Sequence, residues 1–333
     1  MKPYTILGCI ATMTLAYPGM DRVVREIKAR DYGIEKRSPE MIGDLIDGAS
    51  SATGSTIKSI LQGEYAIARR STYTAPGPID SDECKKDTCC IWSYIASDMQ
   101  NAFQDGSSCS DLARGAIRQG FHDAATWDKG SSYGGADGSL LLSDELSRSE
   151  NAGLESIGDQ TKSWFQKYRD HNITMADLIQ AAAIVGVVSC PGGPRIRLFV
   201  GRQDNSQAGP TGMLPSAFAD AQSLIDLFAA KTFSADDLVA LVGAHTVAKQ
   251  STVDASRSGA SEDSTPGTWD NKIYSETLDS GNKSILTFPS DKNLATYSQT
   301  SSQWNTFACT NGQSLWANAS ILFGIFQALL TLL

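Results

Sequence analysis

Two of the chain's three histidines lie in apolar segments, next to residues that could take part in proton chemistry with them. Arg118 precedes His122 by one helical turn, so on a helix both side chains would reach the same space. A neutral histidine can accept a proton near physiological pH, and an arginine can stabilise developing negative charge. His245 lies in a second apolar segment, residues 241–248. For the first segment, an Arg/His pair solvated at the surface is the plain alternative.

Oxygen-bearing residues directly follow both histidines. The first set comprises Asp123, Gly135, Asp137 and Ser139, and the second comprises Thr246, Asp263, Thr265, Thr268 and Asp270. Carboxylates, hydroxyls and carbonyls in this combination suit calcium. A turn rich in Asp, Gly and Ser is often only a turn. Because each set adjoins a candidate functional histidine, we predict two bound calcium ions.

Length and charge limit the kind of protein. A chain of 333 residues can hold one large helical domain with additional tails. The formal net charge is −9, and no basic patch of the type that follows a phosphate backbone is found in the sequence. The sequence therefore predicts no nucleic-acid partner.

The ends of the chain differ from its centre. Residues 1–16 have the pattern of a secretory signal peptide, and residues 17–83, with two dibasic pairs, are typical of a propeptide or a loosely attached arm. We expect the main domain over residues 84–320. The apolar tail, residues 321–333, is either a glycolipid-anchor signal that is removed or the last helix of the domain. It is too short to span a bilayer comfortably.

Cysteine usage agrees with export. Of seven cysteines, Cys9 lies in the signal segment, which leaves an even set that favours disulfides. Sequons at Asn172, Asn282 and Asn318 are consistent with this. We expect a secreted, extracellular protein, attached to the cell surface only if the tail is an anchor signal.

The body has helical patterning throughout. Ser110 can cap a helix that carries Arg118 and His122, and Ser234 can cap the helix before His245. Other segments with helical spacing are residues 91–103, 157–168, 175–189 and 223–230. Alternating strand patterns are scarce, so we predict an all-α fold.

Several motifs in order give the chain a resemblance to a known family. They are Arg118-x-x-Phe121-His122-Asp123, Gly134-Gly-Ala-Asp137-Gly-Ser139, Glu150-Asn151, Cys190-Pro-Gly-Gly-Pro, Gly201-Arg-x-Asp204, Ala244-His245-Thr246, Asp263-Ser-Thr265-Pro-Gly and Ser290-Asp291. In this order they resemble the plant, fungal and bacterial haem peroxidase superfamily, above all its secreted fungal class II branch. The resemblance covers residues 84–316. It implies two helical halves that enclose haem b.

The resemblance assigns a role to each matching residue. His245 would bind the haem iron, with Asp291 accepting the hydrogen of its other ring nitrogen. His122 would be the distal base. Asn151 would fix its tautomer, Arg118 would act on the departing oxygen, and Phe121 would lie over the haem.

The implied reaction is reduction of hydrogen peroxide through a ferryl and porphyrin-radical intermediate, followed by one-electron oxidation of donors. Manganese-oxidising relatives use three acidic residues where this chain has Asp111, Gly115 and Ser251, so a manganese site is not expected. Lignin-type relatives carry a surface tryptophan where this chain has Ala240. We expect a monomer that oxidises small phenol-like donors at the haem edge.

The resemblance also implies disulfides between Cys109 and Cys190 and between Cys84 and Cys90, which would leave Cys89 for Cys309. Two rival functions stay open. One is a metal-dependent hydrolase that uses His122 with Asp123, although zinc sites usually need more His or Cys. The other is a non-catalytic, calcium-stabilised secreted interaction protein on the same fold.

Overall fold

A computed structural model describes residues 73–319 except 129, 197, 232, 280 and 318. The predicted signal peptide, most of the predicted extension and the apolar tail lie outside the described residues. The last part of the extension, residues 73–83, contacts the body through bonds such as Tyr94 Oη to the Gly77 carbonyl (3.0 Å). Within the described part of the chain, no helix is both long and apolar enough to cross a membrane.

The described residues form helices and one very small sheet, as predicted. The α-helices are α3 (Asp82–Lys85), α4 (Thr88–Phe103), α5 (Asp111–Ala124), α6 (Ser139–Leu142), α7 (Glu155–Tyr168), α8 (Met175–Ser189), α9 (Ala221–Ala230), α10 (Ala235–Val242), α11 (Lys272–Leu278), α12 (Pro289–Thr296) and α13 (Ser301–Ala308). Short 3-10 helices span Glu145–Ser147, Ser149–Asn151, Arg169–His171, Gly243–Val247 and Ala255–Arg257. The antiparallel strands β1 (Gln104–Asp105) and β2 (Ser108–Cys109) form the sheet.

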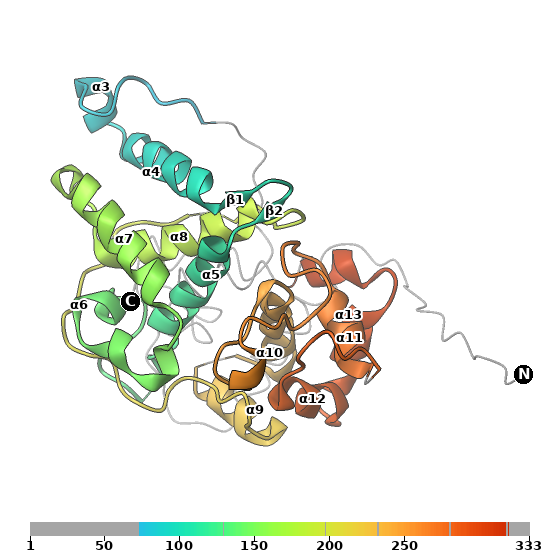
Figure 1. Ribbon diagram of the computed structural model, residues 1–333. Coiled ribbons are helices and arrows are strands. Elements are labelled where there is room, and N and C mark those ends of the chain that lie inside the picture. The colour runs from blue at the N-terminus through green and yellow to red at the C-terminus, as the bar shows by residue number, and fades with distance from the viewer. Residues whose placement is uncertain are drawn as a thin grey trace, which may run out of the picture.

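The helices are arranged in two halves (Figure 1). Helices α4 to α8 form one half, and α9 to α13 form the other, with α5 and α10 near the boundary between them. The predicted caps are present: the Ser110 side chain accepts from the Ala113 N–H, and Ser234 forms a capping box with Asp237. Both helices that lead to the candidate histidines therefore begin where the sequence predicted.

Helix α8 is the centre of the first half. It is apolar on nearly all sides, and residues from Met175 to Val187 are buried along most of its length. A helix that is apolar all round must be covered on all sides. Helices α4, α5 and α7 pack against it. This packing fixes α5, whose opposite face carries Arg118 and His122.

In the second half, large aromatic residues pack behind the end of α10. A Cβ added at Gly243 would lie 2.1 Å from Nε1 of Trp316 and 2.5 Å from Oη of Tyr274. Only glycine permits this approach. The Trp316 indole N–H donates to the Ala240 carbonyl (2.9 Å), and Tyr274 Oη donates to the Val239 carbonyl (2.7 Å). The chain just before His245 is thus held against a rigid, fully buried cluster.

The disulfide predictions are confirmed in two cases and wrong in one. Cys84 pairs with Cys90, and Cys109 pairs with Cys190. Cys89, however, is a free and exposed thiol, so the predicted Cys89–Cys309 bridge does not form. Cys89 lies at the start of α4 in the first half, whereas Cys309 follows α13 in the second half (Figure 1). Cys309 is itself disulfide-bonded, so it is not available to Cys89.

We expect the two disulfides to differ in their contribution to stability, because they close loops of different length. The sequence separation is 81 residues for Cys109–Cys190 and 6 residues for Cys84–Cys90. Loop-closure entropy then predicts a loss of roughly 4–5 kcal/mol when the first pair is replaced by serines and about 2 kcal/mol for the second. Urea unfolding of the two double variants measures the difference. Equal losses would contradict this entropic account.

Candidate active site

A cavity of about 630 Å³ lies between the two halves. Its size falls in the range of ordinary cofactor and ligand sites. One wall comes from α5 and includes Arg118, Phe121 and His122, and the other includes Leu241 and His245. Both candidate histidines and the arginine thus face one space, and the surface-exposed alternative for the Arg118/His122 pair is wrong.

Arg118 is held in place by backbone carbonyls. Its Nη1 donates to the Ala152 carbonyl (2.8 Å) and its Nη2 to the Glu150 carbonyl (3.1 Å). Burial lowers the pKa of Arg118, and the carboxylates of Glu155 and Glu262 oppose that change. An arginine keeps its charge under these conditions. The wall of α5 therefore presents a fixed cation beside His122.

The hydrogen bonds of Asn151 define the tautomer of His122. The Asn151 amide nitrogen donates to the Glu145 carbonyl (2.7 Å), so the amide oxygen faces His122 Nδ1, 2.7 Å away. Because that oxygen can only accept, Nδ1 carries the hydrogen and Nε2 is left as an acceptor. Burial, followed by the charge of Arg118, lowers the pKa of His122 to about 3. His122 is therefore a neutral base that lines the cavity.

Phe121 covers the neighbouring surface of the same wall. Its ring stacks against Phe228 of α9, with ring centroids 6.4 Å apart. It also contacts the His122 ring edge to face, at 6.0 Å. Phe121 lines the cavity, where it was predicted to lie over a bound group.

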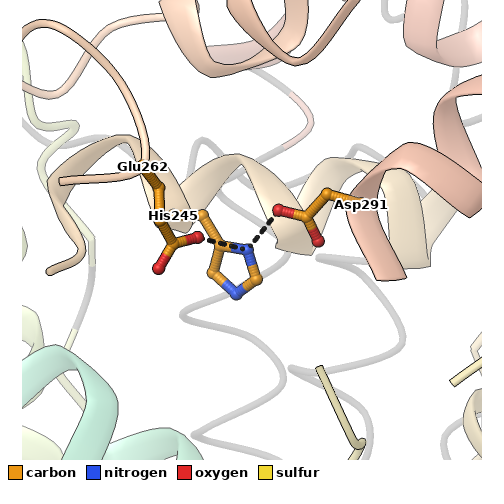
Figure 2. Close-up of side chains that lie close together, drawn as sticks. All are labelled: His245, Glu262 and Asp291. Carbon is orange, nitrogen blue, oxygen red and sulfur yellow. Dashed lines mark hydrogen bonds and ion pairs between the residues drawn. The ribbon is translucent and has the colours of Figure 1, made fainter. Parts of the chain in front are cut away.

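His245 stands on the facing wall, in the 3-10 turn that follows α10. Its Nδ1 lies 2.9 Å from Asp291 Oδ2 of α12 and 3.2 Å from Glu262 Oε2 (Figure 2). Burial alone would lower the pKa of His245, but the Asp291 and Glu262 carboxylates raise it to about 10. The second ring nitrogen points away from both carboxylates. That nitrogen is the atom that the cavity offers to a metal.

Glu262 is a site residue that the sequence analysis missed. It is 1% exposed and lines the cavity beside His245. Burial raises the pKa of the Glu262 carboxyl, while the contact with His245 lowers it. The only signal in the sequence was its place, directly before the Asp263-Ser-Thr265 motif.

The first predicted calcium set gathers behind His122. Asp123 accepts from the backbone N–H groups of Gly138 (3.2 Å) and Leu140 (3.3 Å), and Asp137 accepts from the Ser139 N–H (3.0 Å). The Gly135 carbonyl lies in the same turn and accepts from the Asp137 N–H (2.8 Å). Burial, followed by the Asp137 carboxylate, raises the pKa of Asp123 well above its usual range. Buried oxygen sets of this kind fit calcium.

Asp123 lies in the last turn of α5, where it is fully buried and outside the cavity lining. The hydrolase hypothesis required Asp123 to act beside His122 in one site. The structure does not bring the two side chains into one cavity. Asp123 therefore cannot act beside His122 as the hydrolase hypothesis requires.

The second predicted set gathers behind His245. Thr246 Oγ1 donates to Asp263 Oδ2 (2.5 Å), and Thr265 Oγ1 donates to Asp270 Oδ2 (2.9 Å). Thr268 lies in the same turn, where its N–H donates to the Thr265 carbonyl (2.9 Å). Burial raises the pKa of Asp263 to about 6. This set also has the hard-oxygen composition that suits calcium.

The residues at the positions compared with manganese-oxidising relatives make other contacts in this protein. Asp111 pairs with Arg114 on its own helix and with Lys249 of the second half (3.0 Å). Gly115 packs against Ile157, since a Cβ there would lie 3.2 Å from that side chain. The one carboxylate at these positions is thus already bound to two cationic side chains.

Comparison with known proteins gives one consistent result. A family model described as Peroxidase matches residues 95–310. Ligninase LG5 of Phanerodontia chrysosporium is 33% identical over 68% of this chain and 66% of its own length. Versatile peroxidase VPS1 of Pleurotus eryngii is 31% identical over 68% and 62%, and a peroxidase of Arthromyces ramosus is 29% identical over 77% of each chain. The match thus spans slightly less than two thirds of the first two relatives. The resemblance predicted from the motifs is confirmed, and the chain belongs to the peroxidase family.

Proposed function

We propose that this protein is an extracellular haem peroxidase, which reduces hydrogen peroxide and oxidises small phenol-like donors. The observation that carries the proposal is the pair of histidines on opposite walls of one cavity. Each has Nδ1 engaged by an acceptor, Asn151 for His122 and Asp291 for His245, so each can present Nε2 to the cavity. The non-catalytic alternative gives no reason for this matched arrangement.

The residues present fit haem b. His245 would hold the iron through Nε2, and its bond to Asp291 would fix the ring and increase its basicity. Apolar side chains such as Phe121, Phe228 and Leu241 line the cavity around the polar groups. When bound, haem supplies the metal centre that exchanges electrons with peroxide and donor.

Proton transfer would depend on His122 and on the residues around it. His122 Nε2 would take a proton from one peroxide oxygen and deliver it to the other, so that the second oxygen could leave as water when the O–O bond breaks with electrons that the bound haem would supply. Arg118, held by two carbonyls, stabilises negative charge on the leaving oxygen. Asn151 keeps His122 in the tautomer that can accept. Phe121 excludes water from the same wall.

The donor would approach the apolar edge of the cavity. Phe218 lines it and is 65% exposed, which suits an aromatic donor of small size. We propose that the protein acts as a monomer, because Arg118, His122 and His245 of one chain already meet in one cavity. The disulfides Cys84–Cys90 and Cys109–Cys190 are in keeping with an extracellular location. Calcium at the two oxygen sets would brace the helices that carry the histidines.

The test is the absorption spectrum of the purified full chain, loaded with haem in the presence of calcium. We expect a Soret band that changes on addition of one equivalent of peroxide and is restored by a phenolic donor. His245→Ala is expected to lose stoichiometric haem binding. His171→Ala is the matched control, because this histidine lies outside the cavity lining. If the wild-type chain takes up no haem, the non-catalytic alternative replaces the proposal.

A further inference from the structure

Glu262 places a second carboxylate on the histidine proposed to bind iron. Its Oε2 lies 3.2 Å from His245 Nδ1, on the side of the ring away from Asp291 (Figure 2). The three side chains come from separate segments: the turn after α10, the stretch before Asp263, and α12. Both carboxylates are buried.

The backbone around Glu262 fixes this position. Ser261 forms a bridge with Lys249, and its carbonyl accepts from the Leu286 N–H (2.8 Å). On the other side, Asp263 accepts from Thr246, the residue next to His245. The segment is therefore tied to the His245 turn before and after Glu262, so the carboxylate cannot turn to solvent without breaking these contacts.

Glu262 Oε2 has no hydrogen-bond partner among the described residues. Burial of a carboxyl oxygen that has no hydrogen-bond partner is costly. The hydrogen of His245 Nδ1 goes to Asp291, which forms the bond of good geometry. An apolar side chain of similar size could fill the same space. The presence of a carboxylate at this position therefore indicates an electrostatic role.

We propose that Glu262 is a positioning residue for the proximal histidine, which makes His245 a stronger electron donor to iron than Asp291 alone would. This inference rests on the proposed haem site. A ferric haem core carries net positive charge and loses it on reduction to the ferrous form. A carboxylate behind the ligand therefore stabilises the ferric state, and also polarises the Nδ1–H bond. Both effects lower the reduction potential of the iron.

The test is the ferric/ferrous midpoint potential of the haem-loaded protein, together with the iron–histidine stretching frequency of its ferrous form. Glu262→Gln keeps the shape and removes the charge, so we expect a more positive potential and a lower stretching frequency. Glu262→Asp withdraws the carboxylate by one methylene and should lie between Glu262→Gln and wild type. Glu276→Gln is the matched control, since Glu276 binds Ser264 away from the cavity.

The outcomes distinguish a failure of the Glu262 inference from a failure of the proposed haem peroxidase function. A Glu262→Gln protein with the potential and stretching frequency of wild type and of Glu276→Gln would overturn the role of Glu262. If Glu262→Gln fails to fold or to bind haem, Glu262→Asp decides: wild-type values overturn the inference, and shifted values support it. If the wild-type chain takes up no haem, the proposed function itself fails, and this inference fails with it.

Discussion

His122→Ala is expected to retain haem and to react with hydrogen peroxide about 10²- to 10⁴-fold more slowly than wild type. The reason is the tautomer set by Asn151, which leaves Nε2 of a neutral imidazole free to accept a proton in the cavity. Alanine removes this base and leaves Arg118 in place. Stopped-flow measurement of the second-order rate constant with peroxide gives the effect directly.

Asn151→Ala tests the orientation of the His122 ring separately from the presence of His122. We expect a smaller loss of rate, because His122 remains but the group that fixes its Nδ1–H is gone. His171→Ala should react at the wild-type rate. If His122→Ala also reacted at the wild-type rate while holding haem, His122 would not be the proton acceptor, and the proposed mechanism would be wrong.

The parts of the fold that depend on local interactions could be predicted from the sequence. Ser110 and Ser234 cap their helices through contacts within one turn, so their signals lie within a few residues. The spacing of Arg118 and His122 likewise defines one helix face. That His245 lies across the same cavity is a long-range property, and it was available only through the resemblance of the motifs.

Glu262 and Cys89 show what the sequence could not supply. An acidic residue in a loop is usually solvated, and only the tie between Ser261 and Lys249 brings Glu262 to His245. Cys89 was paired with Cys309 because both remained after other pairs were assigned. Elimination carries no distance information, and the two cysteines belong to different halves of the molecule.

Removal of calcium is expected to lower the free energy of unfolding by about 3–4 kcal/mol for each ion, if the ions are present at 100 to 1,000 times their dissociation constants. The reason is the burial of the two oxygen sets. Asp123 is fully buried, and burial and the Asp137 carboxylate raise its pKa, which means that its charged form needs a cation. Thermal unfolding with a chelator, and again after calcium is added back, measures the change.

Single variants assign this stabilisation to the two sets. Asp137→Asn removes a carboxylate from the set behind His122, and Asp270→Asn removes one from the set behind His245. Each should lose about half of the calcium-dependent stabilisation, because the sets lie in different halves of the protein and should act independently. Asp226→Asn, on α9, is the control and should keep the full effect. A chelator that leaves the unfolding temperature of the wild-type protein unchanged would show that these oxygen sets hold no stabilising ion. The helices that carry His122 and His245 would then depend on the protein's own packing alone.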